Sequence, residues 1–160
     1  MNLTIRRATP SDEAVVVRFN SALALESEGK TLDEAVLGLG VRAALTDPHK
    51  GFYTLAELHG AVVGQVLITF EWSDWRNGWY WWIQSVYVAE EARRQGVFRA
   101  IFHRLKDQAI ADPTVIGLRL YLEEHNQRAR TTYASLGMEP EPYGLMGLYP
   151  LPGRANAIRG

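Results

Sequence analysis

The sequence predicts one mixed α/β domain over residues 1–160, and three observations carry this prediction. Runs of β-branched and aromatic residues alternate with segments whose apolar residues recur at helical spacing. The order of these segments is strand–helix–helix–strand–strand–strand–helix–strand–helix–strand, which is typical of helices packed on a mixed sheet. The length suits one domain with a sizeable core, and no repeat or linker divides it.

A short strand and a long helix are predicted at the N-terminus. Residues 3–5 alternate like a strand. Thr9 followed by Pro10 marks a helix start, because threonine caps helices and proline fits the first helical position. The helix is expected to reach about Leu25, with a polar loop over residues 26–30 after it.

A second helix is predicted after that loop. Thr31 is expected to cap it, with Glu34 three residues on as in a capping box. The helix should run to about Leu45, where the polar residues 47–51 end it.

The middle of the chain is predicted as three strands. Residues 52–57 and 61–72 are strand-like runs, and the dipeptide His59-Gly60 between them is typical of a tight hairpin. A second turn over 75–78 leads into a strand over 79–88.

The last third is predicted to alternate between helix and strand. A helix begins near Gly96, a strand covers residues 115–122, a helix covers 126–136, and a last strand covers 143–149. The tail over 150–160 contains Pro and Gly and is expected to fray.

The composition argues against several classes of function. Seventeen basic and eighteen acidic residues give a net charge of −1, so nothing indicates nonspecific nucleic-acid binding. The chain has no cysteine, which removes disulfides, thiolate metal sites and cysteine nucleophiles. It shows neither a signal-peptide pattern nor an apolar run that could span a bilayer, so we expect a cytoplasmic protein without a membrane partner. The four histidines lack metal-ligand spacing, and no metal is expected.

An anion site is predicted where the strand over 79–88 leads into the helix near Gly96. The free backbone N–H groups of a helix N-terminus and the positive end of its dipole attract phosphate. Arg93, Arg94 and Arg99 add to this field. A P-loop would need Lys-Ser or Lys-Thr after its last glycine, and a dinucleotide fingerprint would need three spaced glycines, so neither fits.

Two segments resemble the GNAT (GCN5-related N-acetyltransferase) family. Residues 93–98, Arg-Arg-Gln-Gly-Val-Phe, follow its Gln/Arg-x-x-Gly-x-Gly/Ala pattern except at Phe98. Residues 126–138 resemble its Asn-x-x-Ala-x-x-x-Tyr-x-x-x-Gly-Phe segment and follow a predicted strand, as in that family. The resemblance covers nearly the whole chain and implies a GNAT-like mixed sheet of about six to seven strands flanked by helices.

The resemblance implies acetyl-CoA as cosubstrate. In the family, the strand before the loop holds the pantetheine arm and the loop amides wrap the pyrophosphate, a close approach that Gly96 permits. Phe98 replaces the usual small residue; its amide can still donate, and its ring can pack under the helix. Asn126 matches a residue that contacts the cofactor or caps the helix. The implied cofactor residues are Val86, Tyr87, Val88, Arg93, Arg94, Gln95, Gly96, Val97, Phe98, Arg99 and Asn126.

The resemblance also assigns the general acid to Tyr133, which matches the tyrosine that protonates the departing thiolate. A phenol with a pKa near 10 suits a thiolate whose conjugate acid has a pKa near 8.5. The alternative is a helix tyrosine that only packs on the core. The implied reaction is direct attack on the thioester by a neutral primary amine of a small molecule or peptide.

The base that would deprotonate the amine is open. Polyamine-type relatives have a glutamate on the strand that leads into the loop, where this chain has Gln84 and Ser85. Glu26, Glu71 and Asp74 are alternatives that would act through water, or they are solvated surface acids.

The acceptor site is predicted near a tryptophan-rich hairpin, because all five tryptophans lie between residues 72 and 82. Alternation places Trp79 and Trp81 on one face of a strand and Trp82 on the other. The cluster is an aromatic wall for a cationic amine, a homodimer contact, or ordinary core. The glutamates of the predicted loop over 26–30 could select an ammonium group. The candidate acceptor residues are Glu26, Glu28, Glu71, Trp72, Asp74 and Gln84.

Two other functions stay open. A catalytically inactive CoA-binding regulatory domain is favoured by the missing strand glutamate and by Phe98, whereas Tyr133 and Asn126 favour the enzyme. A protein-interaction domain would use the tryptophan hairpin as its contact surface.

Overall fold

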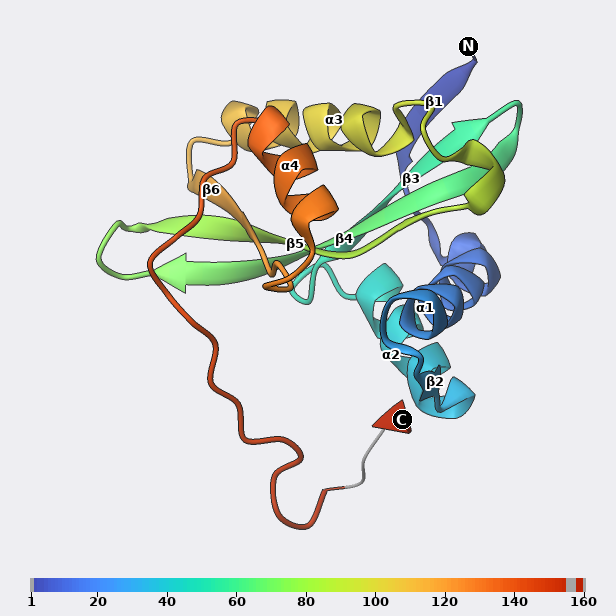
Figure 1. Ribbon diagram of the computed structural model, residues 1–160, viewed down its shortest axis with the longest axis horizontal. Coiled ribbons are helices and arrows are strands. Elements are labelled where there is room, and N and C mark those ends of the chain that lie inside the picture. Colours follow the sequence, from blue (N-terminus) through green and yellow to red (C-terminus); the bar gives the residue numbers. More distant parts are fainter. Residues whose placement is uncertain (1, 155–157, 160) are drawn as a thin grey trace.

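The computed structural model describes residues 2–154 and 158–159, and its centre is a five-stranded mixed sheet (Figure 1). The strand order is β1-β3-β4-β5-β6. A separate antiparallel pair is formed by β2, between α1 and α2, and β7 near the C-terminus. The strands are β1 (Leu3–Arg7), β2 (Thr31–Leu32), β3 (Phe52–Leu58), β4 (Ala61–Ser73), β5 (Gly78–Val88), β6 (Val115–Leu120) and β7 (Ile158–Arg159).

Helices cover both faces of the sheet, as expected for a mixed α/β domain. In Figure 1, α3 and α4 lie on one side of the sheet and α1 and α2 on the other. Two short 3-10 turns, Pro10–Asp12 and Glu90–Ala92, precede α1 and α3. The helices are α1 (Glu13–Glu28), α2 (Glu34–Thr46), α3 (Val97–Ala111) and α4 (Gln127–Ser135). The predicted mixed α/β fold class is confirmed; of the six to seven strands expected in the mixed sheet, the described residues place five there and two in the separate pair.

The connections follow the predicted turn chemistry. The strands β1, β3, β4 and β5 pair antiparallel, and β6 pairs parallel to β5 after the α3 crossover. His59 and Gly60 have φ values of 52° and 82°, the left-handed pair that a two-residue hairpin needs. At Thr9-Pro10, the predicted start is confirmed: the Thr9 N–H donates to the Asp12 carboxylate at 2.7 Å, and a 3-10 turn begins at Pro10.

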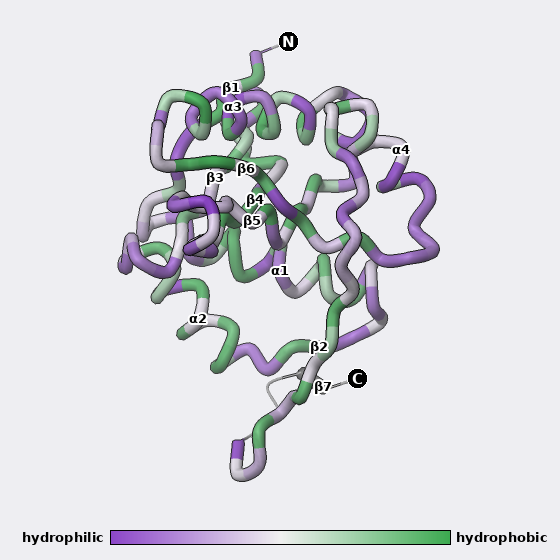
Figure 2. The backbone as a smooth tube through the Cα atoms, turned by 90° about the vertical axis from the view of Figure 1, so that its left-hand side faces the viewer, coloured by the Kyte–Doolittle hydropathy of each residue, from purple (hydrophilic) through white to green (hydrophobic). Residues whose placement is uncertain are grey.

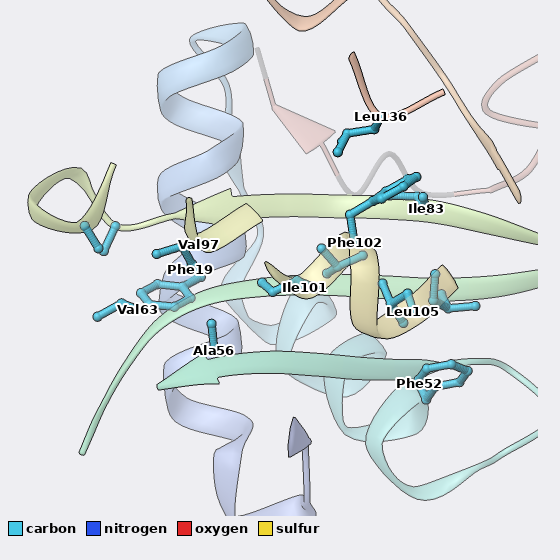
Figure 3. Packing of buried hydrophobic residues seen from close by; sticks show 14 residues of the cluster. Phe19, Phe52, Ala56, Val63, Ile83, Val97, Ile101, Phe102, Leu105 and Leu136 are labelled. Carbon is cyan, nitrogen blue, oxygen red and sulfur yellow. The ribbon is translucent and has the colours of Figure 1, made fainter. Parts of the chain in front are cut away.

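The core on the α3 side is formed by one stripe of that helix. Val97, Ile101 and Leu105 recur every fourth residue and are buried against the sheet (Figure 3). Their sheet partners include Ile68 and Ile83. This packing fixes the start of α3 against the end of β5.

A smaller core lies on the other face. Val16 of α1 and Val41 of α2 pack there on Tyr53 and Leu55 of β3.

No helix among residues 2–154 and 158–159 is long and apolar enough to cross a membrane.

Two predictions about the first helices are wrong. The polar residues 26–28 continue α1, which ends at Gly29 with a φ of 63°. The cap of α2 is Asp33, whose Oδ1 accepts from the amides of Ala35 and Val36 at 3.0 and 3.2 Å, while Thr31 belongs to β2. An aspartate next to the first helical residue reaches these amides better than a threonine two residues earlier.

The predicted strand over 143–149 is also wrong. This part of the chain is irregular and pairs with no strand in the described part of the molecule. Pro140 and Pro142 just before it lack the N–H groups that a ladder needs. Several of its apolar side chains are exposed, Met146 by 98%. Figure 2 shows the chain after α4 descending away from the sheet, with hydrophobic stretches in its lower part.

Candidate active site

The site begins where β5 separates from β6. The ladder between the two strands runs from Trp79↔Val115 to Ile83↔Leu120. Beyond Ile83, residues 84–88 pair only with β4 in the described structure. This end of β5 therefore presents a free backbone edge, of the kind to which an extended amide-containing ligand can add.

The free edge of β5 contains a β-bulge. The register moves from Leu67↔Gln84 to Gln65↔Tyr87, so β5 has one residue more than β4 over this step. Ser85 lies at the bulge with a φ of 51°. A serine in this left-handed region is uncommon and costs free energy.

The predicted anion loop follows directly. Arg94 and Gly96 have φ values of 62° and 76°, and Gly96 is the N-cap of α3. The first turn of α3 contains no acidic residue, so no carboxylate there competes with a bound anion for the free amides of residues 97–99. The turn and the helix end together have the free amides that the predicted anion site requires.

The three arginines near this loop have different partners. The Arg93 guanidinium donates to the Val88 carbonyl at 2.9 Å and to Glu26 at 2.8 Å. The Arg99 guanidinium donates to the Ser135 hydroxyl on α4 at 3.1 Å. Arg94 is exposed. Arg93 thus links the loop to β5 and α1, whereas Arg99 ties α3 to α4.

A cavity of about 380 Å³ lies between the end of β5, the start of α3 and α4. Five of its lining residues were predicted from the sequence: Val86, Arg93, Phe98, Asn126 and Tyr133. The others, Arg128, Ala129 and Thr132, were not. Of these, Ala129 could have been found from spacing, since it lies three residues after Asn126 and four before Tyr133, and residues three and four apart share a helix face.

The remaining predicted cofactor residues do not line this cavity. Val97 is buried in the core below it, and Gln95 donates from its side chain to the Glu91 carbonyl at 2.9 Å. The Tyr87 ring points to the opposite face and packs on Phe19 of α1, with ring centroids 5.0 Å apart. The Tyr87 side chain is therefore turned away from the cavity, and only its backbone groups are available at the free edge.

Tyr133 is half-buried at the wall of the cavity. Its ring meets the Phe98 ring edge to face at 5.8 Å, and the Phe98 ring also lies 6.2 Å from that of Phe102. The ring of Phe98 therefore packs under α3 and α4, away from the loop amides. Burial raises the pKa of Tyr133, so its hydroxyl remains a proton donor at neutral pH.

Asn126 is the N-cap of α4. Its Oδ1 accepts from the Ala129 amide at 3.0 Å, so the capping role that the sequence allowed is present in the structure. Asn126 also lines the cavity, so the start of α4 that it caps lies beside the site.

The predicted acceptor residues do not form one group. Glu71 and Gln84 lie on the sheet face that carries Trp82, where Glu71 accepts from Trp82 Nε1 at 2.7 Å and Gln84 bonds to Thr69. Trp72 lies on the opposite face, with its ring 5.0 Å from that of Trp79. The predicted separation of Trp79 and Trp81 from Trp82 is confirmed by these contacts.

The acidic residues predicted to bind the acetyl acceptor already have ion-pair or hydrogen-bond partners. Glu71 pairs with Arg119 at 3.2 Å, a residue that the sequence did not single out. Asp74 sits in the hairpin turn and accepts from the Trp75 amide at 2.9 Å. Glu28 lies 4.0 Å from Lys30.

Glu26 takes part in the best-defined ion pair near the site. Its bond to Arg93 is the first cause that lowers the pKa of Glu26, and hydrogen bonding with Tyr87 lowers it further. A carboxylate held in this state is a weak base, so Glu26 suits a role in holding the loop better than one in proton abstraction.

A larger cavity of about 540 Å³ lies elsewhere, between α3, β6 and residues 136–142. It contains none of the predicted site residues. Within the described parts of the chain, no group of His, Asp or Glu side chains is arranged to hold a metal ion.

The comparisons with known proteins fit this geometry. Residues 19–138 match the model of the acetyltransferase (GNAT) family. A possible acetyltransferase from Clostridium difficile 630 is 43% identical, with a TM-score of 0.88 over 93% of this chain and 98% of that one. No curated protein matches.

Two more distant structures share the fold. A predicted acetyltransferase from Clostridium acetobutylicum, solved with acetyl-CoA, is 17% identical, with a TM-score of 0.75 over 91% of this chain and 96% of that one. An aminoglycoside acetyltransferase from an uncultured soil metagenomic sample is 19% identical, with a TM-score of 0.73 over 94% and 99%. With its family match and this architecture, the chain belongs to the acetyltransferase (GNAT) family.

Proposed function

We propose that the protein is an acetyl-CoA-dependent N-acetyltransferase that acts on a primary amine of a small molecule or peptide, with Tyr133 as general acid. One observation carries this proposal: Val86 of the free edge of β5, Phe98 in the first turn of α3 and Tyr133 of α4 all line one cavity. One structure with this fold is named an aminoglycoside acetyltransferase, which supports a small-molecule amine as the acceptor.

The residues around the cavity suit each part of acetyl-CoA. Backbone groups of Val86 and Val88 suit the amides of the pantetheine arm, and the amides of residues 96–99 suit the pyrophosphate. Gly96 has open space where a Cβ would stand, which leaves room for the phosphates. When bound, acetyl-CoA supplies the thioester that the amine attacks.

In the proposed reaction, Tyr133 supplies the proton that the departing thiolate takes up. The neutral amine nitrogen forms the new bond to the acetyl carbon, and the carbon–sulfur bond breaks. Tyr133 gives its proton to the sulfur, and the proton lost by the amine passes to water. Solvent then returns a proton to the phenolate. No carboxylate of the described residues needs to act as base in this sequence.

The acceptor is proposed to approach the sheet face that carries Gln84 and Trp82, since Gln84 lies next to the bulge on the free edge of β5. The indole of Trp82 stacks on Tyr121 at 4.4 Å, and this aromatic pair suits a cationic molecule. Glu71 beside it contributes negative charge that Arg119 offsets only in part, because Arg119 also pairs with Glu141 at 2.7 Å.

The test is thiol release from acetyl-CoA with a panel of primary amines, combined with thermal unfolding. A cosubstrate at one hundred times its Kd should stabilise the fold by about 2.7 kcal/mol. Release of CoA with at least one amine is the expected result. Thermal protection without turnover for any amine would instead favour a CoA-binding regulatory domain. Absence of protection would overturn both in favour of a protein-interaction domain.

A further inference from the structure

The bulge in β5 decides which way the strand's side chains face beyond Gln84. Successive strand residues point to opposite faces, so one residue more or less reverses every side chain that follows. With the bulge, Val86 lines the cavity and Tyr87 packs on Phe19 of α1. Without it, Val86 would face α1 and Tyr87 would fill the cavity. The free edge of β5 therefore depends on the strained conformation of Ser85.

Gln65 contacts the bulge from the neighbouring strand. The residue is 0% exposed, and its Nε2 donates to the Ser85 carbonyl at 3.1 Å. Its Oε1 has no hydrogen-bond partner in the part of the chain that the structure describes. A buried amide oxygen without a partner costs free energy, which a leucine of similar size would avoid. Packing alone therefore does not account for a glutamine at this position.

A second buried pair reaches the same serine. The Tyr53 side chain of β3 interacts with the Ser85 side chain, and its hydroxyl accepts from Asn20 Nδ2 of α1 at 3.2 Å. Asn20 is itself fixed, because its Nδ2 also donates to the Val16 carbonyl at 3.0 Å. Buried polar side chains of α1, β3 and β4 thus converge on the one strained residue of β5.

We propose that Gln65 is a positioning residue of the active site: together with Tyr53 and Asn20 it holds Ser85 in the bulge and so directs the free edge of β5 toward acetyl-CoA. This inference rests on the proposed function, in which that edge binds the pantetheine arm. Gln65 does not line the cavity, and it acts only through Ser85.

The first test replaces Gln65 with leucine. Loss of the bond to Ser85 should misplace the edge, and misplacement of about 1 Å can lower kcat/KM for acetyl-CoA about 100-fold. Amide hydrogen exchange of residues 83–88 should become faster, while the circular dichroism spectrum stays that of the wild type. Gln108→Leu is the matched control, because Gln108 Oε1 on α3 is likewise buried without a partner among the described residues.

The second test is rescue by Ser85→Gly in the Gln65→Leu background. Glycine adopts positive φ without steric cost, so the bulge would no longer need Gln65 to hold it. We expect kcat/KM to return to within about threefold of the wild type, a recovery that a general packing defect would not show. If Gln65→Leu does not fold, Tyr53→Phe takes its place, because it removes a single hydroxyl. It should lower kcat/KM and speed exchange of residues 83–88 in the same directions, by smaller amounts.

Wild-type kcat/KM and wild-type exchange in the variants would overturn the proposal, and so would equal effects of Gln65→Leu and Gln108→Leu. The exchange measurement needs no turnover. If the wild-type protein neither binds nor consumes acetyl-CoA, the proposed function fails, and exchange at residues 83–88 still decides whether Gln65 holds the bulge.

Discussion

At the scale of single residues, Tyr133 has the surroundings of a proton donor. Its ring packs on Phe98, the residue lines the cavity, and burial raises its pKa. Gln84 and Ser85 of β5 have no side-chain group that donates a proton as readily as a phenol. The chemistry of the proposed reaction therefore rests on one phenol.

We expect Tyr133→Phe to lower kcat about 100-fold, the lower end of what general acid catalysis contributes. The acetyl-CoA Kd should stay unchanged, because the ring and its packing on Phe98 remain. Steady-state kinetics and calorimetric titration measure the two quantities. Tyr143→Phe, at an exposed tyrosine outside the cavity, is the control. An unaffected kcat in Tyr133→Phe would remove Tyr133 from catalysis.

Asp12 links acid stability to the start of α1. The Arg6 guanidinium donates to both of its carboxylate oxygens at 2.9 Å, and this is the first cause that lowers the pKa of Asp12 to about 2; the Thr9 amide adds to it. A lowered pKa stabilises the folded state above the unfolded pKa, and that contribution is lost as the pH falls from about 4 through 2.

We therefore expect Asp12→Asn to lower the free energy of unfolding at pH 7 by about 2 kcal/mol. The difference between variant and wild type should shrink as the pH falls from 4 to 2, because the wild-type carboxylate is then protonated. Urea unfolding at several pH values measures it. Asp107→Asn, at an exposed position of α3, should show no such dependence, and a constant difference would contradict the assignment.

At the scale of elements, the turn before α3 and the β3–β4 hairpin use glycine in the same way. Gly96 and Gly60 have φ values of 76° and 82°, and an added Cβ would meet no atom within 4 Å at either position. The backbone cost of a side chain should therefore be equal. The two turns differ only in what lies beside them.

We expect Gly96→Ala and Gly60→Ala each to lower the free energy of unfolding by about 1–2 kcal/mol, the cost of the left-handed conformation. Only Gly96→Ala should also raise the acetyl-CoA Kd, because its Cβ enters the space proposed for the pyrophosphate. Urea unfolding and calorimetry separate the two effects. Equal Kd values in both variants would place the phosphates elsewhere.

The order of the elements and most of their bounds were predictable, because hydrophobic periodicity and turn residues act within short windows. The errors concern α1, the cap of α2 and residues 143–149. For α1, residues 26–28 are exposed but include two glutamates, which favour helix, and the left-handed Gly29 rather than the polar run ends the helix. For residues 143–149, strand propensity was present but no neighbouring strand pairs with it.

At the scale of the whole molecule, several exposed large apolar side chains lie close together in sequence at two places. The β4–β5 hairpin exposes Trp72, Trp75 and Trp79, with Trp75 at 87%. The irregular chain after α4 exposes Leu145 and Met146. Exposed apolar surface of this kind marks interaction sites.

We expect the protein to form a homodimer through the hairpin. Size-exclusion chromatography with light scattering should give twice the chain mass, and Trp75→Ser should shift the protein toward monomer. Leu39→Ser, at an exposed leucine of α2, is the control. A monomer at all concentrations would contradict the prediction, and dissociation by Leu145→Ser alone would assign the contact to the chain after α4.

The sequence by itself determined the family, the order of the main helices and strands through α4 and the turn before α3. These depend on a few adjacent residues: Gly96 permits the turn, and the amides that follow have no intrahelical acceptor. The motif around Asn126 and Tyr133 is equally local, and the structure places both at one cavity.

Only the tertiary structure decided how these parts are held together. The Glu26–Arg93 pair and the Gln65–Ser85 bond join residues 67 and 20 positions apart. The separation of Trp72 from Glu71 and Gln84 likewise follows from strand pairing and from the bulge in β5. Such contacts arise when distant segments pack, so no local pattern in the sequence encodes them.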